Sequence, residues 1–241
     1  VVKLSPTGTL VWPAVARIEG SGAGDLQDRL FDLSVIAATG QVLVTGSTNS
    51  TNLPTTPGVL QPTSGGGPSK AFVGQLTANG LGFDFLSYYH PGSIETGVGI
   101  RRDDAGNLYV LTVDTLGTDH NVLCLGFLTP GATQLSFVRY LGDDSGDVLA
   151  AALAVSPDGT ATYGATVRGL PLQTTPGVLG PTSSGAKDGY IERIAPGLPM
   201  MSLSADLVVA EGDSGSQAAV VRVSLSAASL QDTTFGLVTV Y

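Results

Sequence analysis

Residues 152–167 read ALAVSPDGTATYGATV, two runs of small and β-branched residues joined by Ser156-Pro157-Asp158-Gly159. Proline holds φ near about −65° at the second position of a tight turn, and glycine accepts the positive φ that such turns often need at a later position. Valine, threonine and tyrosine on either side suit the pleated surface of a sheet. The stretch therefore predicts an antiparallel hairpin.

The same hairpin pattern occurs twice more, in SVIAATGQVLVTGST at residues 34–48 and in GVGIRRDDAGNLYVLTVD at residues 97–114. The turn glycines of the first and last copies, Gly40 and Gly159, are 119 residues apart. The hexapeptide TTPGVL also occurs twice, at residues 55–60 and 174–179, with the same separation of 119. Two unrelated features with one offset indicate an internal repeat.

A second hairpin pattern alternates with the first. It consists of an apolar stretch, a turn and another apolar stretch, and it occurs at residues 1–12, 72–85, 123–137 and, more faintly, 190–200. Two hairpins give four short antiparallel strands per repeat, as in a propeller blade, and no segment keeps a helical period. We expect an all-β fold of propeller-like, four-stranded antiparallel blades in a partial or small propeller, with a two-sheet sandwich as the alternative.

The TTPGVL segment is missing from the middle repeat, where residues 114–122, DTLGTDHNV, connect two predicted strands directly. A surface excursion between strands costs little to remove if the strands on either side still pair. We therefore interpret this loop as an optional decoration of the sheets.

Composition and charge limit the partners that we expect. Hydrophobic residues make up 42% of the 241 residues and charged residues only 13%, which is typical of a globular chain with a substantial core. The net charge of −9 would repel a phosphate backbone, so nucleic acid is not an expected partner. No apolar run approaches the ~18 residues of a membrane span. A single cysteine, Cys124, excludes an internal disulfide and a multi-cysteine zinc cluster.

The order of motifs resembles a known family. F-V-x-x-L, S-P-T-G, A-V-S-P-D-G and L-P-T-T-P-G-V-L-Q-P-T follow one another over about residues 1–195, and this order resembles the bacterial β-propeller repeats often called SBBP. The resemblance implies large secreted or surface-attached proteins without a common enzymatic activity. We expect about three and a half blades in residues 1–198, and an extracellular, cell-surface or periplasmic location.

Residues 199–241 change in character. MSLSADLVVAEGDSGSQAAVVRVSLS resembles the opening strands of a Calx-β domain, which predicts an incomplete β-sandwich segment. That resemblance implies Glu211 as a calcium ligand, with Asp206 and Asp213 as neighbouring candidates. Solvated acids beside a turn are the competing interpretation, because calcium takes six to eight oxygen ligands and the family's later acidic loops are not in this sequence. No other cofactor is expected.

Other motifs are incomplete. Residues 212–216, GDSGS, match a serine-protease nucleophile motif, but the only histidines, His90 and His120, lack the expected surroundings. Asp143, Ser145 and Asp147 begin like a calcium loop without its glycine and final glutamate, so we interpret them as an exposed turn.

Cys124 and the pair Asp103 and Asp104 have structural interpretations. Cys124 lies in the apolar run LCLGF and is expected to be a small core residue. Asp103 and Asp104 precede Gly106 and are expected to belong to a turn.

These observations favour a non-enzymatic structural or adhesive module. Both ends look cut from a longer pattern, so we expect it to assemble with other subunits or with copies of itself, by strand pairing at the C-terminal segment. One alternative is a propeller enzyme acting on polysaccharide through carboxylates such as Glu95, Asp103 and Asp147. The other is a calcium-dependent binding module centred on Glu211.

Overall fold

The computed structural model is all-β in the part of the chain that it describes. This part comprises residues 3–11, 18, 28–66, 68–90, 95–116, 120–141, 147–168, 187–195, 201–203 and 223–225. The chain forms two compact units, Val1–Ile194 and Ala195–Tyr241. The described residues include one 3-10 turn, Pro130–Ala132, beside the strands, and no helix among them is long and apolar enough to cross a membrane. The prediction of an all-β fold is confirmed.

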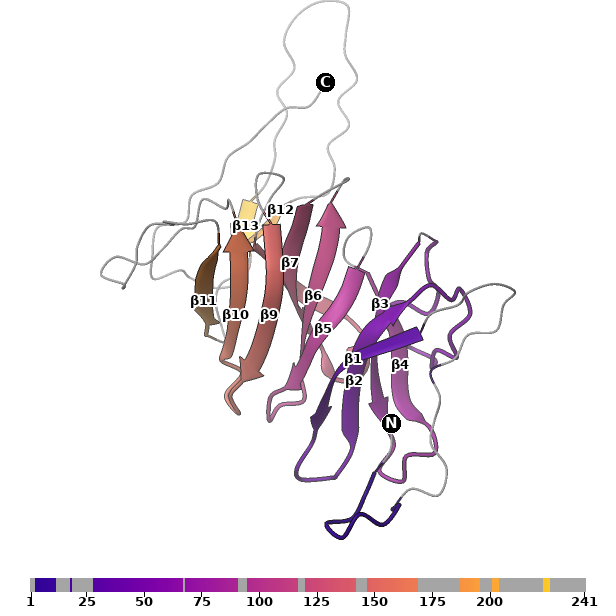
Figure 1. The fold of residues 1–241 in the computed structure, drawn as a ribbon. Helices are drawn as coiled ribbons and strands as arrows, with labels where there is room; N and C mark the ends of the chain where they lie inside the picture. Colours follow the sequence, from indigo (N-terminus) through magenta and orange to yellow (C-terminus); the bar gives the residue numbers. More distant parts are fainter. Residues whose placement is uncertain are drawn as a thin grey trace, which may run out of the picture. The chain divides into compact units, whose positions relative to one another are not determined.

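Three antiparallel sheets make up the described part of the first unit, and each follows the order of the chain (Figure 1). The first sheet contains β1 (Asp28–Val35), β2 (Val42–Thr48), β3 (Lys70–Leu76) and β4 (Phe83–Tyr89). The second contains β5 (Glu95–Arg102), β6 (Leu108–Leu116), β7 (His120–Leu128) and β8 (Leu135–Leu141). The third contains β9 (Asp147–Val155), β10 (Ala161–Arg168) and β11 (Asp188–Ile194).

The turns that join the strands repeat from sheet to sheet. Gly40, Gly106 and Gly159 close the turn between the first and second strands of their sheets, with φ of 72°, 92° and 86°. These are left-handed values that glycine adopts without steric cost. The turn of the second kind of hairpin also repeats. The N–H of Gly8 donates to the Ser5 carbonyl, and the N–H of Gly80 donates to the Thr77 carbonyl, both at 2.9 Å. Both predicted hairpin patterns are confirmed where the chain is described.

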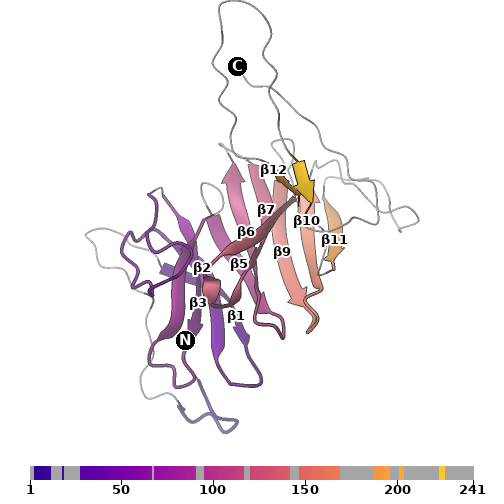
Figure 2. The ribbon, with the colours of Figure 1, turned by 180° about the vertical axis from the view of Figure 1, so that it is seen from behind.

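The sheets stack face to face, with their first strands adjacent (Figures 1 and 2). Strand β5 contacts β1 and β2 of the first sheet and β9 of the third. Successive side chains of a strand point to opposite faces of the sheet, so the side chains of β6 contribute to two hydrophobic cores, one on each face. Leu108 and Val110 pack against the first sheet, whereas Tyr109 and Leu111 pack against the third. The second sheet is therefore buried on both faces, as a blade between two blades is.

The predicted fourth strand of the third sheet lies in residues outside the described part. Among the described residues this sheet has three strands, of which β11 is the first arm of the hairpin predicted for residues 190–200. Residues 196–200 lie outside the described part. In the second unit, β12 (Met201–Leu203) pairs with β13 (Val223–Leu225). Both of these short strands fall in the segment that resembles a Calx-β opening.

The first TTPGVL segment is bound to the sheets along its length. The N–H of Thr56 donates to the Leu86 carbonyl at 3.0 Å, and the Leu86 N–H donates back to Thr56 Oγ1 at the same distance, so the segment covers the outer edge of β4. The N–H of Leu60 donates at 2.7 Å to the carbonyl of Ala132, in the 3-10 turn between β7 and β8 of the second sheet. Val59 is buried in the core between these two sheets. The interpretation as an optional decoration is wrong for this copy, and the second copy lies outside the described residues.

Substituting Val59→Ala should therefore lower the free energy of unfolding by about 1–2 kcal/mol, because it removes two buried methyl groups from the core between two sheets. Chemical denaturation would measure the change. The matched control is Val11→Ala, a valine with 46% of its surface exposed, which should change stability by less than about 0.5 kcal/mol. Equal effects of the two substitutions would contradict a structural role for the segment.

Candidate functional site

The first strand of each sheet begins with an acidic residue: Asp28 in β1, Glu95 in β5 and Asp147 in β9. Glu95 and Asp147 are buried although carboxylates rarely are. A buried carboxylate needs a charged or hydrogen-bonding partner, since desolvation of the charge is otherwise very costly. The partners of Glu95 and Asp147 show what these acids do.

Glu95 lies at the junction of the first and second sheets. It sits directly opposite Asp114 in the pairing of β5 with β6, and both side chains are almost completely buried. Lys70, the first residue of β3, reaches across from the first sheet and places Nζ 3.8 Å from Glu95 Oε2. The ammonium group offsets the charge of the Glu95 carboxylate in a region with little water.

Asp147 makes the corresponding connection between the second and third sheets. Its Oδ1 accepts the backbone N–H of Asn121, in β7 of the second sheet, at 3.1 Å. Its Oδ2 accepts a hydrogen bond from Arg168 of its own sheet at 3.0 Å. Glu95 and Asp147 therefore both join the first strand of one sheet to the third strand of the sheet before it.

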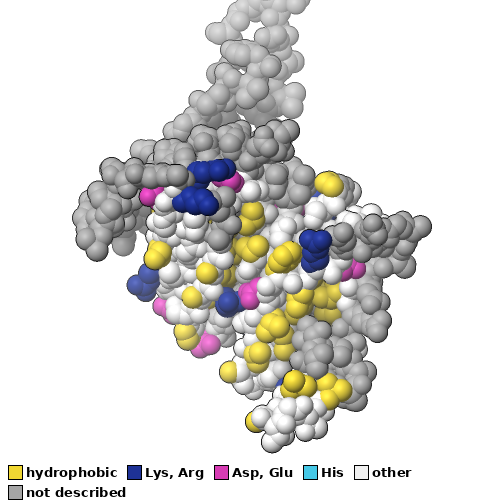
Figure 3. All heavy atoms as spheres, in the orientation of Figure 1, with side chains coloured by type: hydrophobic (Ala, Val, Ile, Leu, Met, Phe, Trp, Pro, Cys, Tyr) yellow, Lys and Arg dark blue, Asp and Glu magenta, His cyan; other side chains and the backbone are white. Residues whose placement is uncertain are grey.

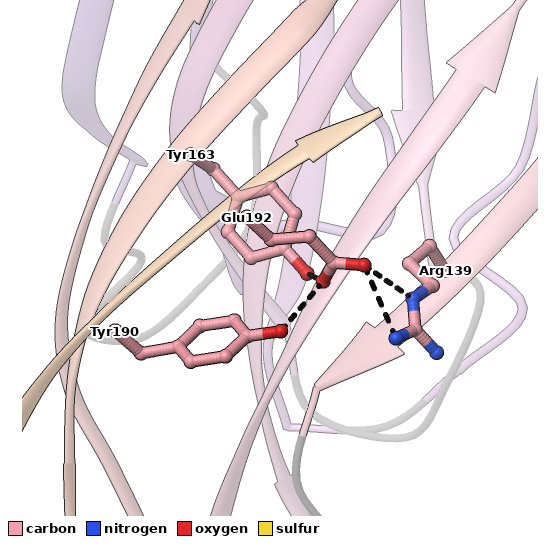
Figure 4. A network of polar contacts seen from close by, with 4 residues as sticks. All are labelled: Arg139, Tyr163, Tyr190 and Glu192. Carbon is pink, nitrogen blue, oxygen red and sulfur yellow. Dashed lines mark hydrogen bonds and ion pairs between the residues drawn. The ribbon is translucent and has the colours of Figure 1, made fainter. Parts of the chain in front are cut away.

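A further polar network connects the second and third sheets near β8 and β11 (Figure 4). Glu192 Oε1 accepts hydrogen bonds from Arg139 Nε and Nη2 at 3.3 and 3.2 Å. Glu192 Oε2 accepts hydrogen bonds from the hydroxyl groups of Tyr163 and, at 3.3 Å, Tyr190. Burial and the neighbouring Glu192 carboxylate raise the pKa of both tyrosines, so both remain hydrogen-bond donors at neutral pH.

The carboxylates proposed for a polysaccharide-cleaving site do not all come together. Glu95 opens β5, whereas Asp103 follows its last residue, Arg102, about 25 Å away along an eight-residue strand. Asp103 accepts hydrogen bonds from Asn107, through its N–H and its side-chain amide, both at 2.8 Å, and from Tyr109 Oη at 3.1 Å. Asp103 therefore belongs to the turn between β5 and β6, as the sequence predicts.

Several predicted residues fall outside the described part of the chain. They include the calcium candidates Glu211, Asp206 and Asp213, residues 212–216, and Asp143 and Ser145 of the calcium-loop-like motif. Among the residues that are described, no group of three or more His, Cys, Asp or Glu side chains could hold a metal ion. His90 follows the last residue of β4, and burial, with Lys70 nearby, lowers its pKa.

Cys124 is a core residue, as the sequence predicts. It is completely buried in β7, beside Thr112 and Tyr89. Burial raises the pKa of its thiol to about 12. The hydroxyl of Tyr89 approaches the second sheet at Gly126, where the Cβ of any other residue would overlap it. The thiol and the hydroxyl thus belong to the closely packed junction of the first two sheets.

The sequence did not single out Lys70, Asp114, Arg139 or Glu192. Each of them acquires its role from a residue in another strand, and two of the pairings, Lys70–Glu95 and Arg139–Glu192, cross from one sheet to another. An acidic residue at the start of each repeat was a visible signal for Glu95 and Asp147, but their partners depend on how the sheets stack. No model of a known protein family matches the sequence of this chain. A search of curated proteins likewise finds no similar sequence.

Lys70→Met should lower the free energy of unfolding by about 3–5 kcal/mol, because it removes the ammonium group that lies beside the buried carboxylate of Glu95. Denaturation by urea at neutral pH would measure this. Arg168→Met is the control, since the side chain of Arg168 is 55% exposed and its ion pair with Asp147 should contribute about 1 kcal/mol or less. A Lys70→Met protein as stable as the control would contradict the assignment.

The thiol of Cys124 should resist alkylation in the folded protein. With a pKa of about 12, only about one thiol in ten thousand is ionised at pH 8, and the side chain is also shielded from the reagent. Mass spectrometry after treatment with iodoacetamide should show unmodified native protein and complete modification in urea. Equal rates in the two states would show that the junction between the first two sheets is open.

Proposed function

We propose that this protein is a non-enzymatic, extracellular structural or adhesive β-repeat module that assembles with other subunits or copies in a surface or filamentous complex. Its stacked sheets act as a rigid body, and its function lies in the surfaces that this body presents. The partners are proteins.

The observation that carries the proposal is what two buried acids and one half-buried acid contact. Glu95, Asp147 and Glu192 each accept hydrogen bonds or an ion pair from a neighbouring sheet. A catalytic carboxylate has to reach the substrate's reacting atoms, and paired catalytic carboxylates have to flank one bond. These three acids are instead directed at protein groups, where they hold one sheet to the next.

Two further features support an extracellular setting. The order of motifs resembles SBBP-type repeats, a family whose members are mostly secreted or attached to the cell surface. The described loops are rich in threonine, serine and glycine, as in residues 47–56 and 62–66. Its one cysteine is buried, so the fold does not depend on the redox state of its surroundings.

A screen for polysaccharide cleavage tests the proposal against the enzyme alternative. We expect no release of reducing ends from neutral, acidic and amino-sugar polymers by the purified protein, because Glu95 and Asp147 serve the sheet junctions. The informative variants are Glu95→Gln and Asp147→Asn, and the control is Asp158→Asn, which changes an exposed carboxylate in the turn between β9 and β10.

Turnover that disappears in a folded Glu95→Gln or Asp147→Asn protein and persists in Asp158→Asn would overturn the proposal in favour of an enzyme. Circular dichroism would establish that each variant is folded. The same preparations address the calcium alternative: a Tm that rises with millimolar calcium in the wild type, and not in Glu211→Gln, would make the chain a calcium-dependent module instead.

A further inference from the structure

Strand β1 carries a row of exposed apolar side chains on the outer face of the first sheet. Leu33 and Val35 pair with Val44 and Val42, which belong to the apolar cluster on the side away from the second sheet. Cross-strand partners share a face of the sheet, so Leu33 and Val35 point the same way. Leu30, Phe31, Leu33 and Val35 are between 41% and 59% exposed. We call these four residues the β1 strip; in Figure 3, hydrophobic side chains cross this region toward the N-terminal hairpin.

The position of Leu33, at the centre of the β1 strip, is buried in the other two sheets. By strand register, Leu33 corresponds to Ile100 in β5 and to Leu153 in β9, since each pairs with the third residue of the next strand. Ile100 is 0% exposed and Leu153 6%, because each packs against the sheet before it, whereas Leu33 is 46% exposed. The β1 strip is thus the surface on which this repeat normally receives a preceding sheet.

The third sheet presents the complementary surface at the other end of the stack. In the second sheet, the side chain of Leu125 in β7 packs against the third sheet. Ile191 in β11 corresponds to Leu125, because each pairs with the fourth residue of the strand before it, and Ile191 is 78% exposed. The same face carries two small residues of β10, Thr162 and Gly164, and the exposed Arg193 of β11, which pairs with Thr162. We call this surface the β11 face. Beside the small residues, side chains from another sheet can pack against Ile191.

We infer that the β11 face of one copy packs against the β1 strip of a second copy, so that the protein associates head to tail. The contact would continue the stacking already present between the first and second sheets and between the second and third. One chain carries both halves of this contact on opposite ends, which makes the interface heterologous and lets copies join into chains. The inference rests on the proposed role in assembly and names the surfaces that carry it.

Sedimentation velocity and light scattering over a range of micromolar concentrations test the association. The average mass of the wild type should rise above the 24.4 kDa of one chain as concentration increases. Leu33→Asp and Ile191→Asp should each weaken association at least about a hundredfold, because a carboxylate would be buried without a partner. Leu81→Asp, at a residue of the turn after β3 that is 56% exposed, should associate like the wild type.

Disulfide trapping tests the pairing of the two surfaces. Because Cys124 is buried, a cysteine introduced on the surface is the only accessible thiol of the described residues. A mixture of Leu33→Cys and isotopically labelled Ile191→Cys should form dimers that contain one chain of each kind. A mixture of Leu33→Cys with Leu81→Cys should not form mixed dimers above background.

Each other outcome decides against the inference. If the wild type stays monomeric, the β11 face is a solvent-exposed end of the stack and does not bind a second copy. Dimers formed equally well by Leu33→Cys alone would show that two first sheets meet back to back. Neither result contradicts the proposed function, because that proposal is tested by the absence of polysaccharide cleavage. Conversely, cleavage by a protein that still associates head to tail would contradict the proposed function and would leave the inferred association unaffected.

Discussion

The second sheet has to be covered on both faces, and the rest of the first unit is arranged around that requirement. In β6 and β7 both sets of alternating positions are apolar: Leu108 and Val110 face the first sheet, while Tyr109 and Leu111 face the third. A strand of this kind loses its driving force for folding if either neighbour is removed, because half of its apolar surface returns to water. The three sheets therefore stabilise one another as neighbours, as repeats in a stacked protein do.

Charged residues determine how the stacked sheets meet. Packing of alternating apolar side chains tolerates small shifts, whereas Lys70 must lie beside Glu95, and Asp147 must reach the N–H of Asn121. Buried ion pairs add little net stability over apolar residues of the same size, but a shifted arrangement would leave a buried charge without its partner. We regard these contacts as fixing the register between sheets. The same reasoning explains why acids that look available for chemistry in the sequence are directed at neighbouring strands.

The local part of the fold could be predicted from the sequence. Turn glycines such as Gly106 and Gly159 and the β-rich runs on either side identify each hairpin, because a tight turn depends on residues next to one another. The role of the first TTPGVL segment could not be predicted in this way: its turn chemistry is visible, but the burial of Val59 depends on a core formed by strands distant in sequence. The partners of Glu95 and Glu192 were missed for the same reason, since Lys70 and Arg139 are brought to them by the stacking of sheets.

Native-state hydrogen exchange tests the stacking most directly. If the second sheet is held between its neighbours, the central amides of β2, β6 and β10 should exchange only through unfolding of the whole unit, with one common free energy and one common dependence on urea. A free energy for β10 that lies several kcal/mol below that for β6 would show that the third sheet opens by itself. That result would contradict the account of three sheets that depend on one another.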